Sequence, residues 1–355
     1  MRVETEQFSN EFLERKDGWP AVRNAFRLPQ ENVTGLDHDL AYRALSTGKT
    51  DLIDLYSTDA EIAFYHLRVL EDDKAFFPKY DAVFLYRLDL ETRAPSFIRS
   101  LKRLEGQVTA AQMIHMNAAS KLDKRSEASV AAAFLGDTLH IRTTLNETTL
   151  FSIFLLRTKE HLILVAISLA LSMLFAVPLG VLAYNRPRLG QGILAFVAAI
   201  YTIPSLALLV FMIPFFGIGT LPAIAALFLY GLLPIVRNTH TGLAGISPAL
   251  RESAIVLGLS PMARLIKIEL PLASPSIAAG IKTAAVINIG TATLGALIGA
   301  GGYGQPILTG IRLADNSLIL LGAVPAAALA LIVQSGFGAL ERTILPRGLR
   351  LKVRS

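Results

Sequence analysis

The chain has 355 residues, enough for two domains of ordinary size, and it contains no cysteine. Disulfide bonds, thiolate metal sites and cysteine nucleophiles are therefore excluded. Residues 1–136 carry 18 basic and 21 acidic side chains, whereas residues 137–355 carry 16 basic and 7 acidic ones. Because the basic excess belongs to the more apolar part, it favours a membrane surface over a nucleic acid as partner.

Residues 1–136 have the composition of a soluble α/β domain. Short apolar runs at 67–72 and 82–87 predict strands, and the patterns at 40–48 and 95–106 predict helices. The triplet Asp37-His38-Asp39 stands directly ahead of the first of these helices. Helix capping explains that triplet more simply than a metal site does. Composition alone assigns this domain no role.

Five later segments are apolar enough to cross a hydrocarbon layer, which requires about 20 helical residues. Several contain proline, which removes a backbone hydrogen bond and kinks a helix. Their interiors carry no acidic residue, histidine or arginine, whereas ion-coupled transporters usually place ionisable groups at mid-membrane. A transporter of this sequence would therefore take its energy from elsewhere. The five segments are 162–184, 193–216, 221–236, 277–300 and 318–340.

Lysine and arginine in alternate connecting loops set the expected orientation. The first and third loops and the C-terminal tail are basic, the second loop is uncharged and the fourth has one arginine. We therefore expect the basic loops and the tail in the cytoplasm and residues 1–160 on the outer side of the plasma (inner) membrane. Arg157 and Lys159 stand against this rule, and Glu160 offsets one of them.

The third loop contains the most informative stretch, 249–275, which reads ALRESAIVLGLSPMARLIKIELPLASP. Its pattern predicts two short helices, the first of which ends at Gly258. The second is expected to run to about Leu270, where Pro271 and Pro275 would stop it. Two short helices on a basic cytoplasmic loop predict a protruding docking surface.

Fixed positions in this loop match the coupling motif of ABC importer permeases: Glu-Ala-Ala, three residues, Gly, nine residues, then Ile-x-Leu-Pro. The loop therefore resembles the segment that, in that family, inserts into a cleft on the ATPase subunit. Serine replaces the first alanine, a small-for-small change that we expect docking to tolerate. The matching residues are Glu252, Ser253, Ala254, Gly258, Ile268, Leu270 and Pro271.

The segments 202–209, 228–239 and 279–307 resemble the permeases of osmoprotectant importers, which move glycine betaine, choline, carnitine and related quaternary amines. The resemblance covers residues 150–342 and implies an α-helical permease domain of the type I importer kind. It implies a homodimer or a pair of related permeases, together with two cytoplasmic ATPase subunits. Whether a separate substrate-binding protein also takes part is left open. The chain itself would then be no enzyme and hold no cofactor, since ATP and magnesium belong to the ATPase.

The N-terminal part resembles the substrate-binding protein of the same systems. In that family, tyrosines at the positions of Tyr56 and Tyr80 contribute to an aromatic cage around the ligand's quaternary ammonium. The negative faces of aromatic rings suit a permanent cation, and each contact is worth roughly 0.5–2 kcal/mol. Thr58 and Asp59 follow Tyr56 closely and either orient the ligand or cap the next helix. The matching segments are 11–19, 35–45, 51–62 and 70–83.

This second resemblance is incomplete. Such binding proteins hold their ligand between two lobes, and this chain matches the second lobe and the closing part of the first. The sequence also begins without the basic-then-apolar pattern of a signal peptide. Three interpretations stay open: a truncated gene, a domain that has lost ligand binding, or a partner that completes the domain.

Two glycine motifs are expected to have no nucleotide role. The stretch 299–304 fits GxGxxG, but it ends a membrane segment instead of following a strand. Gly48-Lys49-Thr50 resembles the end of a P-loop, but Arg43 occupies the position of the required glycine. Both motifs agree with a chain that is served by a separate ATPase.

The sequence favours the permease subunit of an ATP-driven importer for quaternary-amine osmoprotectants. The alternative is a membrane-anchored solute receptor or sensor, which would need neither a pathway nor the docking motif. A membrane enzyme is disfavoured because the predicted spans hold no nucleophile–base or metal constellation. The expected plan is a partial substrate-binding-like domain (1–136), a linker and pre-membrane helix (137–160), a transmembrane permease domain (161–342) with the coupling loop 249–275, and a basic cytoplasmic tail (343–355).

Overall fold

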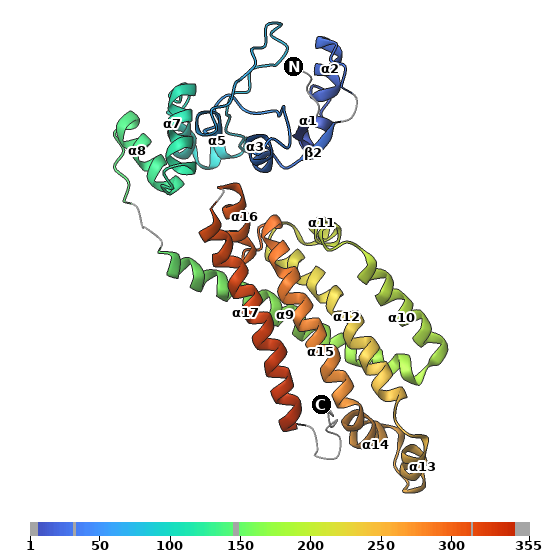
Figure 1. The fold of residues 1–355 in the computed structure, drawn as a ribbon. Helices are drawn as coiled ribbons and strands as arrows, with labels where there is room; N and C mark the ends of the chain where they lie inside the picture. The colour runs from blue at the N-terminus through green and yellow to red at the C-terminus, as the bar shows by residue number, and fades with distance from the viewer. Residues whose placement is uncertain (1–5, 31–32, 145–148, 314, 345–355) are drawn as a thin grey trace. The chain divides into compact units, whose positions relative to one another are not determined.

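The computed structural model describes residues 6–30, 33–144, 149–313 and 315–344, and the chain is drawn in Figure 1. It divides into two compact units. The first comprises Met1–Glu147 with Arg312–Ala314, and the second comprises Thr148–Ile311 with Asp315–Ser355. The basic tail expected from residue 343 lies almost wholly outside the described residues.

The first unit is built on two short parallel strands, β1 (Gln7–Ser9) and β2 (Thr34–Leu36). Glu6 adds a parallel bridge to Leu52 beside them. The other regular elements of this unit are helices. They are α1 (Asn10–Glu14), α2 (Trp19–Phe26), α3 (His38–Ser46), α4 (Glu61–Phe64), α5 (Leu90–Arg93), α6 (Pro95–Lys102), α7 (Ala110–Lys121) and α8 (Glu127–Leu139).

Side chains at the helix starts explain several of these elements. The Ser9 side chain accepts a hydrogen bond from the Phe12 amide and begins α1. The Asp37 side chain accepts from the Asp39 amide and begins α3, which confirms capping as the role of this triplet. Among the described residues, no group of histidine and acidic side chains is placed to hold a metal ion. The helices expected at 40–48 and 95–106 are also confirmed, as α3 and α6.

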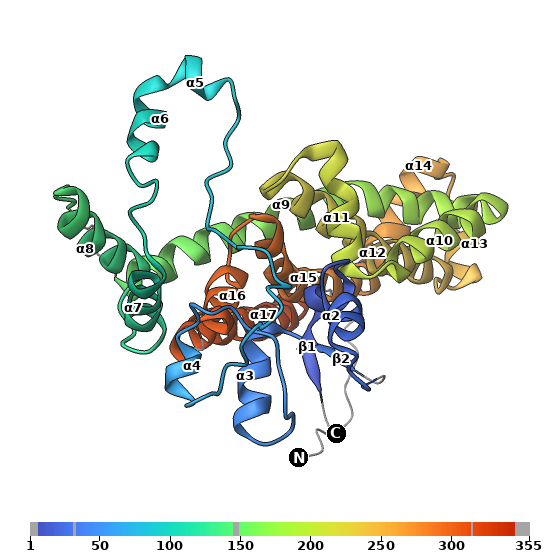
Figure 2. The same cartoon turned by 90° about the horizontal axis from the view of Figure 1, so that it is seen from above.

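The strands expected at 67–72 and 82–87 are wrong. Both segments have an irregular, unpaired backbone, and Leu85 is 98% exposed. A strand needs a neighbouring backbone to bond with, and in the described part of the chain β1 and β2 pair with each other instead. In Figure 2 the chain between α4 and α5 runs as an open trace.

The second unit is a helical bundle centred on α12 (Thr220–Ala244), which packs against both α9 (Leu150–Asn185) and α15 (Leu270–Ala292). Figure 1 shows α13 and α14 at one end of this bundle and α11 and α16 at the other. The remaining elements are α10 (Pro187–Thr202), α11 (Ser205–Phe216), α13 (Pro248–Val256), α14 (Pro261–Arg264), the π-helical turn η1 (Leu265–Glu269), the 3-10 helix η2 (Thr293–Ile298), α16 (Gly304–Arg312) and α17 (Asn316–Ile344).

Within the described residues, four helices are long and apolar enough to cross a membrane, and α10 with α11 makes a fifth span if the bent pair counts as one. These elements cover the five predicted segments, except that the fourth, 277–300, extends two residues beyond the end of η2. The bend of 100° falls where Pro204 precedes α11, as expected of a residue that cannot continue a helix. The helix of the first span begins at Leu150 instead of residue 162, so its N-terminal part includes the ionisable side chains of Glu160 and His161.

Small residues bring the bundle helices into close contact. Gly231 of α12 faces Ser172 of α9 so closely that a Cβ at this position would overlap the serine hydroxyl. The Ser172 hydroxyl donates to the Phe228 carbonyl at 2.9 Å, and the Asn288 amide donates to the Ser168 hydroxyl at 3.1 Å. These bonds link three helices through groups that lipid would leave unsatisfied.

Candidate functional site: coupling loop and aromatic cluster

Helix α13 begins with Pro248 in its first turn, where a missing N–H costs nothing. It ends in a Schellman motif: Gly258 N–H donates to Ile255 O at 2.9 Å, and Leu259 N–H donates to Ala254 O at 3.2 Å. Gly258 has a φ of +76°, a left-handed conformation that other residues adopt only with strain. The glycine of the motif is therefore required by the turn itself.

The faces of α13 are sharply divided. Ala254 lies on the buried face of α13, whereas Glu252 and Ser253 are exposed. A large apolar surface is exposed on the same loop, and Val256 is 86% exposed. Exposed apolar side chains gathered on one loop are typical of an interaction site. Its members are Leu250, Ile255, Val256, Leu257, Met262 and Ile266.

The expectation that Pro271 and Pro275 end the second loop helix is wrong. Helix α14, the turn η1 and helix α15 follow one another without a break. In η1 the Leu270 N–H bonds to Leu265 O, five residues back. This wider turn accommodates Pro271, whose ring would otherwise clash with the carbonyl four residues earlier. Ile268, Leu270 and Pro271 of the motif therefore lie at the start of a membrane-spanning helix.

Sequence reasoning missed an ionic cluster beneath α13. Glu269 is only 3% exposed, and its Oε1 lies 3.1 Å from Arg264 Nε and 3.4 Å from Arg251 Nε. The Arg251 guanidinium also donates to the Leu243 carbonyl and lies 4.7 Å from the centre of the Tyr184 ring. The signal available in the sequence was an acidic residue between the apolar motif positions Ile268 and Leu270.

In the first unit, Asp59 is the centre of an aromatic cluster. Its Oδ2 accepts from the Tyr42 hydroxyl at 2.5 Å and from the Tyr56 amide at 3.0 Å, and it lies 3.1 Å from His38 Nε2. The His38 ring lies 5.4 Å from each of the Tyr42 and Tyr56 rings. Asp59 therefore shapes the loop that carries Tyr56 and does not cap α4 with its side chain.

The same contacts shift the titration of this cluster. The hydrogen bond to Asp59 raises the pKa of His38 above its ordinary value, against the opposing effect of burial. Burial of Asp59 favours its neutral form, but the hydrogen bonds from His38 and Tyr42 outweigh burial and hold the pKa of Asp59 below its ordinary value. The contacts therefore favour the imidazolium form of His38 and the carboxylate form of Asp59.

The two tyrosines predicted to form a cage lie in different surroundings. Tyr56 is half-exposed and has the edge-to-face contact with His38. Tyr80 is also half-exposed, but its hydroxyl accepts a hydrogen bond from Arg15 Nη2 at 2.7 Å, and the Arg15 guanidinium lies 5.2 Å from its ring centre. A cation of the protein thus already occupies one face of Tyr80.

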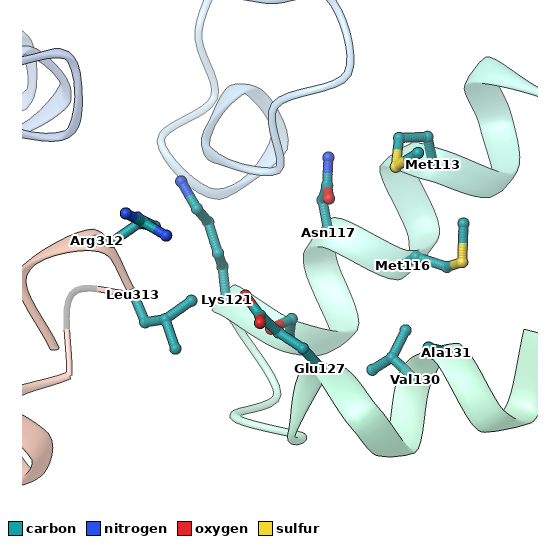
Figure 3. A pocket seen from close by; sticks show the side chains of 10 residues that line it. Met113, Met116, Asn117, Lys121, Glu127, Val130, Ala131, Arg312 and Leu313 are labelled. Carbon is teal, nitrogen blue, oxygen red and sulfur yellow. The ribbon is translucent and has the colours of Figure 1, made fainter. Parts of the chain in front are cut away.

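Thr58 contributes its backbone to the structure around Asp59. The Asn117 side chain of α7 donates to Thr58 O at 2.9 Å. One helical turn further along α7, Lys121 Nζ lies 2.7 Å from Glu61 Oε1 and 3.1 Å from Asp39 Oδ1. Figure 3 shows Asn117 and Lys121 extending from the helix in the same direction. Helix α7 therefore holds α3 and the loop of Tyr56 together.

Comparison with known families agrees with this division of the chain. Residues 3–137 match the substrate-binding domain of ABC-type glycine betaine transport systems. Residues 173–346 match the inner membrane component of binding-protein-dependent transport systems. Together with the spans and the coupling motif, these matches define the class as an ABC importer permease preceded by a substrate-binding-like domain.

Several curated permeases are similar over the second unit. The glycine betaine/carnitine/choline transport permease OpuCB of Bacillus subtilis is 44% identical over 197 residues, which are 55% of this chain and 90% of the relative. The osmoprotectant import permease OsmW of Salmonella typhimurium is 43% identical over 198 residues, 92% of its length. The chain belongs to the family of osmoprotectant ABC importer permeases.

A solved structure supports the fold of the bundle. An inward-facing form of the MetNI methionine ABC transporter superposes with a TM-score of 0.51 at 25% sequence identity. The match covers 55% of this chain and 98% of that chain. The bundle is therefore an almost complete permease of the type I importer kind, and the chain is a multi-pass membrane protein.

Proposed function

We propose that this chain imports quaternary-amine osmoprotectants such as glycine betaine, choline or carnitine, driven by a separate ATPase. The observation that carries the proposal is the exposed apolar surface of α13 within a coupling motif, on a bundle similar to permeases of these solutes. A surface of this kind needs a protein partner. A sensor without transport activity would have no use for it.

The energy source follows from the same reasoning. ATP and magnesium would bind to a pair of cytoplasmic ATPase subunits, and this chain would contribute the pathway together with a second permease copy. Closure of the ATPases would drive the bundle between outward-open and inward-open states. The basic loops support a cytoplasmic α13 and an outer position for the first unit.

The role proposed for the first unit is capture of the quaternary amine. The exposed face of Tyr56 supports it, because an exposed aromatic ring can accept a methylated ammonium. Tyr80 joins such a cage only if the ligand's cation replaces Arg15 over its ring. Asp59 and Thr58 serve the cage by holding the Tyr56 loop.

Uptake of radiolabelled choline, glycine betaine and carnitine tests the proposal in cells that lack their own carriers. The chain is co-expressed with the ATPase of its importer, and the complex is purified through a tag on the permease. We expect ATP-dependent uptake of at least one of the three and co-purification of the ATPase. The proposal would be refuted if well-expressing cells showed no uptake and the purified permease carried no ATPase.

Val256→Asp addresses the docking surface directly. This change places a charge on an 86% exposed apolar side chain of α13 and should remove the ATPase from the purified complex. The matched control is Ile218→Asp, a 79% exposed apolar position in the uncharged loop between α11 and α12. The control should retain the ATPase.

A further inference from the structure

A single arginine joins the coupling loop to the spans. Arg251 stands on α13 next to Glu252 of the motif, yet its side chain turns inward. Its guanidinium donates to Leu243 O in the last turn of α12 and stacks on Tyr184 at the end of α9. The same side chain pairs with Glu269, which immediately precedes α15. One residue thus contacts the ends of all three central helices.

The carboxylate at the centre of this cluster is held firmly. Glu269 is almost completely buried, and a buried carboxylate is tolerated only with charged partners and hydrogen bonds. Arg264 supplies one hydrogen bond at 3.1 Å, and Arg251 supplies an ion pair from the other side. Two arginines therefore pair with one buried carboxylate.

The cluster also lies at the start of an unbroken helical rod. Residues Pro261–Ile298 form a single candidate span that includes α14, η1 and α15. Leu265, Leu272 and Ile277 of this segment pack against the buried cluster that contains Leu243 of α12. A displacement of α13 therefore reaches α15 through Glu269 and reaches α12 through the Leu243 carbonyl.

We propose that Arg251, Glu269 and Arg264 form a clamp that converts movement of the coupling loop into movement of α9, α12 and α15. The inference rests on the proposed function, because it assigns the transmission step of that transport cycle to particular side chains. Docking and transmission are then separate tasks. Exposed Glu252 and the apolar surface bind the ATPase, and the inward-facing clamp passes on its motion.

The separation predicts a distinctive defect. In the purified complex reconstituted in lipid vesicles, Glu269→Gln and Arg251→Lys should keep the ATPase bound and hydrolysing ATP. Substrate delivered per ATP hydrolysed should fall by at least about fivefold, the lower range of typical allosteric coupling. Lysine keeps the charge at position 251 but lacks the forked donors that reach two partners at once.

Lys267→Gln is the matched control, because it removes a charge from an exposed side chain in the same turn as Glu269. It should leave the ratio of uptake to hydrolysis unchanged. Should Glu269→Gln fail to accumulate in the membrane, the double variant Arg264→Gln/Glu269→Gln removes the buried charge pair together. That variant should show the same fall in the ratio.

A second readout does not depend on the substrate. The chain lacks cysteine, so Thr241→Cys on the exposed side of α12 can carry a single thiol label. ATP added to the complex should change the labelling rate of this cysteine in the parent protein and not in the Glu269→Gln background.

The outcomes separate the clamp from the proposed function. A parent protein that responds to ATP but imports none of the three amines would refute the proposed substrates while leaving the clamp testable. The clamp would be overturned if uptake and ATP hydrolysis fell in equal proportion in Glu269→Gln. It would also be overturned if that variant kept both the ratio of uptake to hydrolysis and the labelling response to ATP.

Discussion

The carboxylate of Glu160 accepts a hydrogen bond from the backbone N–H of Gly302, with 2.8 Å between the two atoms. The same oxygen lies 2.9 Å from Arg157 Nη1. The bond ties the N-terminal part of α9 to the loop between η2 and α16. It also explains why Arg157 is tolerated on the side that the distribution of basic residues disfavours, because its charge is paired within the protein.

Gly301→Ala should destabilise the second unit more than Gly299→Ala does. Both glycines have a φ near +78°, which costs an alanine about 1 kcal/mol or more. Only at Gly301 would the new Cβ also overlap the Glu160 carboxylate. Thermal unfolding of the detergent-solubilised chain measures the difference. Equal losses in the two variants would contradict the proposed role of Glu160 in holding this loop.

A second pair of glycines tests the packing of the central helices. Gly231→Ala should lower the free energy of unfolding by about 1–3 kcal/mol, because the new methyl group would press on Ser172 across the contact between α12 and α9. Gly290→Ala on α15 is the control, since a Cβ there meets open space. Chemical unfolding in mixed micelles compares the two. A larger loss of stability in Gly290→Ala would contradict the close contact between Gly231 and Ser172.

The His38–Asp59 pair predicts a pH dependence of the first unit's stability. Since the folded pKa of His38 is raised, its contribution is complete below about pH 6.5 and disappears as the pH rises through the raised value. The lowered pKa of Asp59 acts in the opposite direction, so its contribution is present above about pH 4 and is lost as the pH falls through the lowered value. Stability of this unit should therefore be highest in the mildly acidic range.

Trp19 fluorescence can follow this effect in the full chain, because the indole is buried against Phe8 at 4.5 Å in the first unit. The thermal midpoint of the wild-type signal should fall between about pH 5.5 and about pH 8.5. His38→Gln should remove most of that fall. His66→Gln serves as the control for general titration, and an equal effect of the two variants would count against the assignment.

Arg15 makes a specific prediction for ligand capture. If Tyr80 belongs to the cage, Arg15→Gln should strengthen binding of glycine betaine by roughly three- to tenfold, because the ligand would no longer displace a guanidinium from the ring. Calorimetric titration of the full chain measures the affinity. Tyr80→Ala in the Arg15→Gln background should remove the gain. An affinity that Arg15→Gln leaves unchanged would place the cage around Tyr56 alone.

The membrane half of this fold could be read from the sequence because its signals are local and strong. Apolar length predicts each span, and Gly258 predicts the end of α13 because a left-handed turn requires it. The continuation through Pro271 could not be read in this way. It depends on a π-helical turn that forms only in the folded bundle, so a proline that usually stops a helix lies inside one.

The side-chain clusters around Glu269 and Asp59 could not be predicted from the sequence for a different reason. Arg251 and Glu269 are separated by a turn and another helix, and only the approach of α9, α12 and α15 brings Tyr184 and Leu243 to them. His38 likewise reaches Asp59 across most of α3 and a loop. The strand predicted at 82–87 failed because β-patterning reports a suitable side-chain sequence and not the presence of a pairing partner.

The bend between α10 and α11 has a consequence for how the protein matches its bilayer. A straight helix over residues 187–216 would be about 45 Å long, half as long again as a hydrocarbon core of about 30 Å. The 100° turn at Pro204 removes this hydrophobic mismatch, which tilting or local thickening of the bilayer would otherwise have to absorb. The permease can therefore carry a long apolar segment without depending on an unusually thick membrane.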